Sequence, residues 1–154
     1  KQDNFVDVII PRGGKALIKK ISSESKIPVI KHLDGNCHVY IDREADFKTA
    51  MNCTLNSKTQ RYGVCNAAES LLIHKSFPKQ SVLKILVALS ERNVQIRGCK
   101  KTKSIFKETI SAKELDWYEE YLKPIIAVKI VSSIDEAIDH IEKYGSNWRQ
   151  RSLC

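Results

Sequence analysis

Apolar residues along this chain follow two spacings: short continuous runs, and longer stretches with a helical period. The continuous runs are rich in β-branched residues and predict buried strands over 5–10, 27–30, 37–41, 70–74, 94–97 and 125–131. Apolar residues three and four positions apart predict helices over 15–23, 46–58, 66–69, 79–92 and 133–144. Residues 100–117 are polar and follow neither spacing. Because predicted strands and helices alternate, the pattern indicates an α/β fold.

Turn and cap residues mark the ends of several predicted elements. The sequence Pro11-Arg12-Gly13-Gly14 ends the first predicted strand and precedes the first helix. A strand, turn, helix, strand unit of this length favours parallel pairing of its two strands. In the last predicted helix, Ser133 is placed to cap the amino end and Gly145 to stop the carboxyl end.

Composition narrows the class of protein. With 154 residues, 42% hydrophobic and 29% charged, the chain has the length for one globular domain or for pieces of two. No apolar run approaches the roughly 20 residues that span a bilayer, and the first residues lack the apolar core of a signal peptide. The five cysteines are widely spaced and form no CxxC or Cys/His metal pattern. We therefore expect a cytoplasmic setting, with no disulfide framework, metal site or membrane partner.

The net charge of +8 raises the question of nucleic-acid binding. The cations are scattered among Asp and Glu, and no nucleic-acid-binding motif is present, so we expect no nucleic-acid partner. Positive charge equally suits phosphorylated substrates and nucleotide cofactors.

Cys65 is the residue with the most distinctive surroundings. It follows the basic, amide-rich stretch from Asn56 to Tyr62, and it precedes a predicted helix over 66–69. A thiol reacts as its thiolate, which nearby cations and a helix amino terminus favour. The alternative is a buried, inert cysteine, which is the commoner situation for this residue type. Local chemistry alone leaves both interpretations open.

Several motifs in the same order resemble the gamma-glutamyl phosphate reductase family of the aldehyde dehydrogenase superfamily. The resemblance covers residues 5 to about 146. The motifs that carry it are Ile9-Ile10-Pro11-Arg12-Gly13-Gly14, Ile27-Pro28-Val29-Ile30, Gly35-Asn36-Cys37-His38-Val39-Tyr40-Ile41-Asp42, Lys58-Thr59-Gln60-Arg61, Cys65-Asn66 and Asp135-Glu136-Ala137-Ile138-Asp139-His140-Ile141.

The resemblance implies an aldehyde-dehydrogenase-like α/β fold and a division of the chain. Residues 1–33 would form the carboxy-terminal part of a Rossmann-like NADP-binding domain. Residues 34–146 would form the first, incomplete part of the α/β catalytic domain, and residues 147–154 are a tail that departs from the family. Family members are substantially longer, so the chain resembles an internal fragment.

The activity that the resemblance implies is the NADPH-dependent reduction of L-glutamyl 5-phosphate to L-glutamate 5-semialdehyde, with release of phosphate, in proline biosynthesis. Its substrate is a small molecule, and the full-length enzyme would be a homo-oligomer. The alternative is a truncated, catalytically inactive remnant that acts at most as a binding module. An unrelated cysteine acyl-transfer enzyme would instead need a histidine base, from His32, His38 or His74.

Residue roles follow from the resemblance position by position. Cys65 would be the nucleophile that forms a thioester. Lys58 and Arg61 would hold the acyl phosphate, or they form a solvated basic turn. Asn66 would brace the nucleophile or merely cap a helix.

The cofactor NADP(H) would be held by two segments. Backbone amides of Arg12, Gly13 and Gly14 would face the cofactor at a helix amino terminus, although without the resemblance this segment is a structural turn. Glu120 would contact the nicotinamide ribose, and Leu122 would take the place of an aromatic packing residue. The other interpretation of Glu120 is a solvated side chain.

Overall fold

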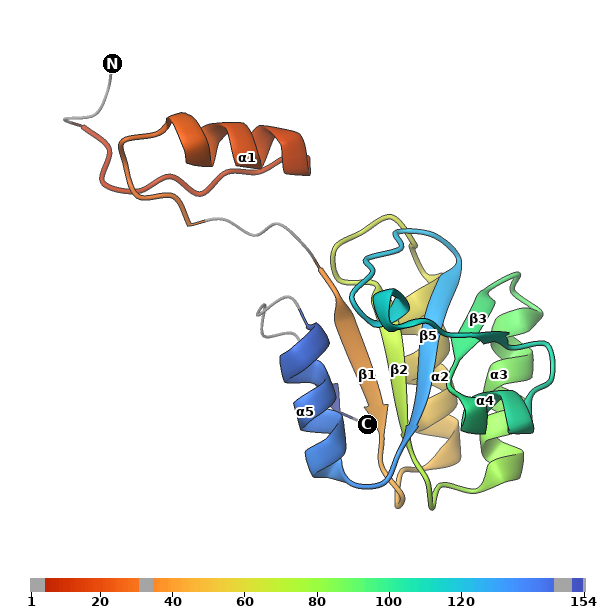
Figure 1. Ribbon diagram of the computed structural model, residues 1–154. Helices are drawn as coiled ribbons and strands as arrows, with labels where there is room; N and C mark the ends of the chain where they lie inside the picture. Colours follow the sequence, from red (N-terminus) through yellow and green to blue (C-terminus); the bar gives the residue numbers. More distant parts are fainter. Residues whose placement is uncertain (1–4, 31–34, 146–150, 154) are drawn as a thin grey trace. The chain divides into compact units, whose positions relative to one another are not determined.

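The computed structural model describes residues 5–30, 35–145 and 151–153 (Figure 1). The chain divides into two compact units, Lys1–Asp34 and Gly35–Cys154. The domain boundaries given above remain a prediction, and most of the predicted tail lies outside the described residues.

The first unit is built on helix α1, Lys15–Glu24, which confirms the predicted helix. The predicted strands on either side meet at one parallel bridge, between Ile9 and Val29. Two hydrogen bonds support it, from Ile9 N to the Pro28 carbonyl and from Ile30 N to the Ile9 carbonyl, both 2.9 Å long. The parallel direction is as predicted, but one pair of residues makes a bridge and not a strand, because a ladder needs several successive pairs.

The second unit contains one parallel sheet with the strand order β4-β3-β5-β2-β1-β6. All its pairs are parallel, and β2 lies between β5 and β1. The strands are β1 Cys37–Ile41, β2 Ala68–His74, β3 Gln95–Gly98, β4 Ile110–Ser111, β5 Ile125–Val131 and β6 Arg151–Leu153. The α/β class matches the fold expected from the alternation of predicted strands and helices.

Helices cover both faces of this sheet (Figure 1). On one side lie α2 Phe47–Thr59, α3 Lys79–Ser90 and α4 Lys100–Ile105, and on the other lies α5 Ile134–Tyr144. Alternate strand residues therefore pack into different cores, with Leu71 in the α2/α3 core and Leu72 beneath α5. Burial on both faces explains why the strands read as continuous apolar runs.

The helix predicted over residues 66–69, directly after Cys65, is wrong. Residues 66–69 do not form a helix, because β2 already begins at Ala68 and is buried throughout. Pairing with β1 and β5 on both sides outweighs the helix propensity of Ala67, Ala68 and Glu69. Cys65 thus lies in a turn that leads into a strand.

The polar segment 100–117, which showed no period in the sequence, holds three short elements. Besides α4 and β4 it contains the 3-10 helix η1, Glu114–Trp117. Each element has six residues or fewer, so a periodic apolar pattern has no room to appear.

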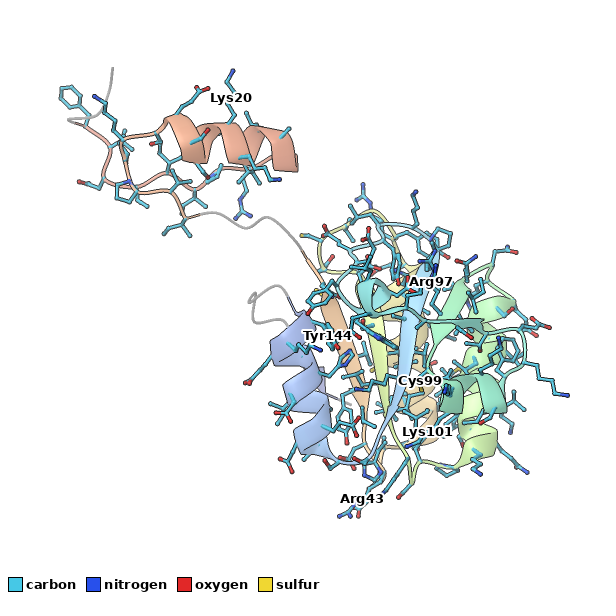
Figure 2. The ribbon with its side chains drawn as sticks, viewed as in Figure 1. Lys20, Arg43, Arg97, Cys99, Lys101 and Tyr144 are labelled. Carbon is cyan, nitrogen blue, oxygen red and sulfur yellow. The ribbon has the colours of Figure 1, made fainter. Side chains whose placement is uncertain are left out.

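A cluster of buried polar and aromatic side chains fixes the amino end of β1. The Asn36 side-chain amide donates to the carbonyls of Trp117 and Tyr144, at 2.7 and 2.8 Å. His38 Nδ1 lies 2.9 Å from the Asn36 carbonyl, and the His140 ring meets the Trp117 ring edge-on. Tyr144, labelled in Figure 2, is the last residue of α5, so the cluster joins η1 and α5 to the start of β1.

Both histidines of this cluster are held neutral. Burial lowers the pKa of His38 to about 4. Burial, followed by the nearby Lys129 ammonium and His38, lowers the pKa of His140 to about 3. Because Lys129 Nζ can only donate, the 3.4 Å contact makes His140 Nδ1 the acceptor.

We expect the stability of this unit to fall as the pH drops from 6.5 to 5. In that range His38 and His140 become protonated in the unfolded chain but not in the folded state, so each removes stability with a limiting slope of about 1.4 kcal/mol per pH unit. Urea unfolding at several pH values measures the slope. His140→Phe keeps an aromatic ring and should reduce the slope by roughly half. An unchanged slope in that variant would show that His140 is protonated in the folded state.

Candidate active site

Cys65 lies in an exposed turn between α2 and β2, and its main chain is tightly enclosed. A Cβ added to Gly35 would lie 2.1 Å from the Cys65 carbonyl oxygen and 2.9 Å from Glu120 Oε1. Real side chains do not tolerate the shorter distance, so this position needs a glycine. The segment before β1, the Cys65 turn and the loop that carries Glu120 therefore meet at one point.

Two hydrogen bonds hold this meeting point. Gly35 N donates to Glu120 Oε1 at 2.8 Å, and the Cys37 thiol donates to the Cys65 carbonyl oxygen at 3.3 Å. The carbonyl of Cys65 is thus fixed from two sides while its side chain remains at the surface. A cysteine with a restrained main chain and an accessible sulfur has the geometry that a nucleophile needs.

A buried ion pair lies beneath the turn. Lys58 Nζ contacts Glu69 Oε2 at 2.6 Å, and neither side chain has any exposed area. The other carboxylate oxygen of Glu69 accepts a hydrogen bond from Leu122 N at 3.1 Å. Burial lowers the pKa of Lys58 and raises that of Glu69, and the contact between them opposes both shifts.

The ion pair supports the loop that carries Glu120. Leu122 adopts a φ of 50°, an unfavourable value for a residue with a branched side chain. The hydrogen bond that Leu122 N donates to Glu69 is one of the contacts that hold this conformation. Contacts therefore run without a break from Lys58 through Glu69 and the 118–124 loop to Gly35 and the Cys65 carbonyl.

The predicted site residues lie in different places. Arg61 and Asn66 are exposed in the turn that carries Cys65. Lys58 is not exposed beside them, because its ammonium is engaged by Glu69 in the interior. Cys65 lacks the helix amino terminus expected from the sequence, since the residues after it enter a strand.

The predicted cofactor residues lie in both units. In the first unit Gly13 has a φ of 149°, and Gly14 is the cap residue before α1 and offers no side-chain cap. The backbone amides in the first turn of this ten-residue helix therefore receive no hydrogen bond from a cap side chain, which leaves them as possible donors to an anionic ligand. In the second unit Glu120 is half-buried beside Gly35, and Leu122 is exposed.

Sequence reasoning missed Gly35, Cys37 and Glu69 as parts of this site. One signal was available for Glu69, which stands inside the apolar run Ala67–Ile73. A carboxylate in a strand buried on both faces requires a cationic partner. Lys58 and Arg61 are the nearest cations before it in the sequence.

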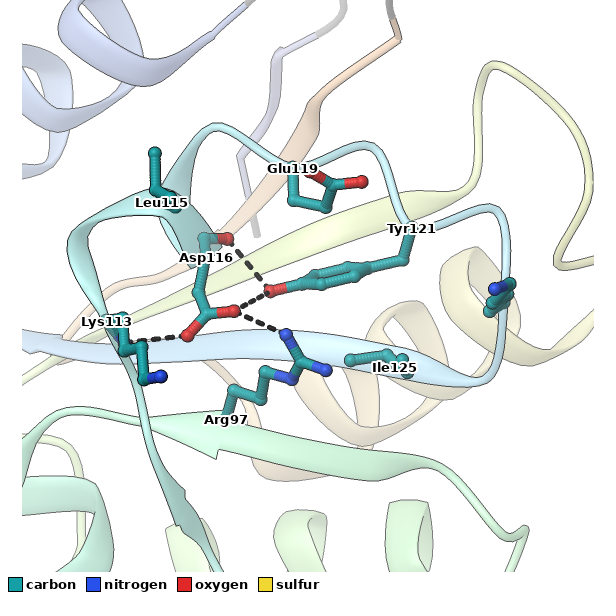
Figure 3. Close-up of a pocket in the computed structure, with 8 residues that line it drawn as sticks. Arg97, Lys113, Leu115, Asp116, Glu119, Tyr121 and Ile125 are labelled. Atoms are coloured by element: carbon teal, nitrogen blue, oxygen red, sulfur yellow. Dashed lines mark hydrogen bonds and ion pairs between the residues drawn. The ribbon is translucent and has the colours of Figure 1, made fainter.

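A hollow of about 360 Å³ lies beside the 118–124 loop (Figure 3). Asp116 is at its centre and accepts hydrogen bonds from Arg97, from Lys113 N and from the Tyr121 hydroxyl. Its lining is Arg97, Lys113, Leu115, Asp116, Glu119, Tyr121, Lys123 and Ile125. The Tyr121 hydroxyl thus ties the 118–124 loop to Asp116, while Glu120 in the same loop accepts a hydrogen bond from Gly35 N.

Within the described part of the chain, no group of three or more His, Cys, Asp or Glu side chains is placed to hold a metal ion. No helix in that part has the length and apolar character to span a membrane.

Comparisons with known proteins agree with the resemblance inferred from the motifs. No family model matches the chain. A gamma-glutamyl phosphate reductase from Ruthia magnifica subsp. Calyptogena magnifica is 49% identical over 146 residues, covering 95% of this chain and 35% of the relative. The crystal structure of gamma-glutamyl phosphate reductase from Thermotoga maritima superposes with a TM-score of 0.91 at 42% identity, covering 99% of this chain and 37% of that one. The chain thus resembles a segment of gamma-glutamyl phosphate reductase and spans about a third of these relatives' length.

A more distant structure supports the fold alone. Betaine aldehyde dehydrogenase from Staphylococcus aureus, solved in complex with NAD⁺, superposes with a TM-score of 0.65 at 15% identity, covering 88% of this chain and 37% of that one. The fold is therefore aldehyde-dehydrogenase-like, as expected from the sequence.

Removing the cation of the buried ion pair should destabilise the fold. In Lys58→Met the Glu69 carboxylate would be buried without its partner, and we expect a loss of about 3–5 kcal/mol in the free energy of unfolding, measured with urea. Lys48→Met on the exposed face of α2 is the matched control, with an expected change below about 0.5 kcal/mol. The double variant Lys58→Met, Glu69→Gln should recover part of the loss. Equal effects at positions 48 and 58 would contradict the buried pair.

Adding one methyl group at Gly35 should displace the Cys65 turn. Gly35→Ala places a Cβ 2.1 Å from the Cys65 carbonyl, and we expect it to lower stability by about 1–3 kcal/mol and to change the rate at which iodoacetamide alkylates Cys65. Gly63→Ala is the control in the same turn, because an added Cβ there has nothing within 4 Å. A Gly35→Ala protein that matches Gly63→Ala in both measurements would show that the turn is not constrained at Gly35.

Proposed function

We propose that this chain carries the nucleophile of an NADPH-dependent, phosphate-releasing reductase that converts L-glutamyl 5-phosphate to L-glutamate 5-semialdehyde. The single observation that carries the proposal is the constrained, exposed Cys65 turn in a chain 49% identical to a gamma-glutamyl phosphate reductase. The proposal includes the expected cytoplasmic location and, for the whole enzyme, a homo-oligomer.

In the proposed reaction the Cys65 thiolate attacks the acyl carbon of the substrate. The carbon–oxygen bond to phosphate breaks, phosphate leaves, and a thioester remains on Cys65. Negative charge develops on the acyl oxygen during the attack, and the backbone N–H of Cys65 is the donor expected from the resemblance. The contacts of Gly35 and Cys37 with the Cys65 carbonyl support this step, because they restrain the main chain from which that N–H projects.

Arg61 is the cation best placed for the acyl phosphate. Its exposed guanidinium lies in the same turn as Cys65, and guanidinium binds phosphate oxygens in a bidentate manner. Lys58 has a different part in this proposal. Its ammonium holds Glu69, and through Leu122 N it acts on the site by positioning the 118–124 loop. Asn66, exposed on the other side of Cys65, remains a proposed substrate contact.

The residues present fit NADP(H). The cofactor, when bound, supplies the hydride that reduces the thioester. The uncapped amino end of α1 presents backbone amides suited to a pyrophosphate, with the exposed Arg12 beside them. In the second unit the Glu120 carboxylate, which accepts a hydrogen bond from Gly35 N, is the proposed contact for a ribose hydroxyl, and the exposed Leu122 offers an apolar contact.

A cysteine acyl-transfer enzyme with a histidine base has less support. His38 is buried and its Nδ1 engages the Asn36 carbonyl, and His74 lies at the carboxyl end of β2, away from the Cys65 turn. His32 lies outside the described residues. The catalytically inactive remnant remains the competing proposal, because the chain spans 35% of its relative.

The proposal is tested in the reverse direction with L-glutamate 5-semialdehyde, phosphate and NADP⁺, followed as NADPH formation. We expect a phosphate-dependent signal that falls about 1,000-fold or more in Cys65→Ser. Cys99→Ser, which changes a half-buried cysteine before α4, is the matched control and should retain the signal.

Iodoacetamide alkylation of Cys65 and circular dichroism in parallel establish that the sample is folded with an accessible thiol. A folded chain whose Cys65 alkylates but which gives no phosphate-dependent signal would contradict the reductase proposal for this chain and support the inactive remnant.

A further inference from the structure

A second thiol lies directly beneath Cys65. Cys37 begins β1, is buried, and donates a hydrogen bond from its sulfur to the Cys65 carbonyl oxygen at 3.3 Å. Its neighbour Gly35 approaches the same carbonyl so closely that an added Cβ would lie 2.1 Å away. The two cysteines come from segments 28 residues apart and are brought together by the fold.

Cys37 and Cys65 lie close enough to form a disulfide after a small movement of the Cys65 turn. Given a 3.3 Å contact between the Cys37 sulfur and the Cys65 carbonyl, covalent geometry places the two Cα atoms no more than about 8.5 Å apart. A disulfide needs Cα atoms about 4.4–6.8 Å apart. A shift of about 2 Å, with the Cys65 side chain turned toward Cys37, brings the pair into this range. The movement breaks the hydrogen bond from Cys37 to the Cys65 carbonyl and loosens the contact with Gly35, but it breaks no strand pairing, because β2 begins only at Ala68.

We propose that Cys37 is a resolving thiol for Cys65, so that a peroxide converts the pair to a Cys37–Cys65 disulfide. In the first step the Cys65 thiolate attacks one peroxide oxygen, the O–O bond breaks and hydroxide leaves, which gives a sulfenic acid. In the second step the Cys37 sulfur attacks the Cys65 sulfur, the S–O bond breaks and the Cys37 proton leaves with the oxygen as water. Overall, two thiols lose two electrons and hydrogen peroxide becomes two molecules of water.

The electrostatics assign the two roles. Burial, with smaller contributions from Cys65, Glu69 and Glu120, raises the pKa of Cys37 to about 11. Cys37 therefore stays protonated and buried, while Cys65 is exposed to a peroxide in solution. Once Cys65 is a neutral sulfenic acid, its charge no longer opposes ionisation of Cys37, and the second step becomes easier.

The disulfide would protect the exposed sulfur. A sulfenic acid that is not captured proceeds to sulfinic and sulfonic acids, which are not reduced by thiols, whereas a disulfide is. This proposal needs only the two thiols and an oxidant, so it stands or fails independently of the reductase activity.

The test is a peptide map of the whole chain after treatment with hydrogen peroxide and alkylation of the remaining thiols. We expect a mass loss of about 2 Da, a peptide pair joining residues 37 and 65, and reversal by dithiothreitol. In Cys37→Ser the fraction of Cys65 present as sulfinic or sulfonic acid should rise severalfold. Cys53→Ser, at a half-buried position on α2, is the matched control and should behave as the unmutated chain.

The unmutated chain is sufficient to overturn the proposal, so the result does not depend on whether Cys37→Ser folds. Recovery of Cys37 as an intact thiol while Cys65 becomes sulfinic acid would exclude it. Linkage of Cys65 to Cys53, to Cys99 or to a second copy of the chain, seen as a dimer on a non-reducing gel, would exclude it as well.

Discussion

The buried ion pair between Lys58 and Glu69 is the contact on which the arrangement around Cys65 depends. It joins residues 11 positions apart, at the end of α2 and the start of β2, and Cys65 lies in the loop that it closes. Neither side chain is exposed, so each charge needs the other. Because Glu69 also accepts from Leu122 N, the same pair sets the position of the loop that meets Gly35.

The Lys58–Glu69 pair differs from the ion pairs at the surface because it is buried. Arg43 and Glu44 lie 3.5 Å apart with more than half of each side chain exposed, and such pairs contribute little to stability. A buried pair contributes little net stability relative to apolar residues of the same size, but loss of one partner is severe. The role of Lys58 and Glu69 is therefore geometric, since they fix where the Cys65 turn and the 118–124 loop can lie.

The sequence predicts the elements that depend on local residues better than those that depend on contacts between distant parts of the chain. The strands 37–41 and 125–131 are confirmed at both ends, because burial on both faces leaves an uninterrupted apolar run. The caps of α5 are confirmed as well, since Ser133 accepts from Glu136 N and Gly145 ends the helix, and both signals are local.

The site itself was less predictable, for one identifiable reason. Assigning residues 66–69 to a helix placed Glu69 on a short helix, where a carboxylate needs no partner, and left Lys58 free for the substrate. The strand in fact begins at Ala68, because its neighbours β1 and β5 pair with it, and neither neighbour is close in sequence. Burial of Glu69, and with it the engagement of Lys58, follows from that long-range pairing.

Cys65 lies at the amino edge of the sheet, and this position determines which groups could bind an anion beside it. In a parallel α/β sheet, ligands more commonly bind at the carboxyl edge, where helix amino termini favour anions. At the amino edge the helices end instead. The last residue of α2, Thr59, precedes the Cys65 turn, and Tyr144 at the end of α5 contacts Asn36 just before β1. Helix carboxyl termini carry partial negative charge and disfavour an anionic substrate. In the proposed reaction an acyl phosphate beside Cys65 would therefore have to be held by side-chain cations, and Arg61, exposed in the same turn, is one residue in a position to supply that charge.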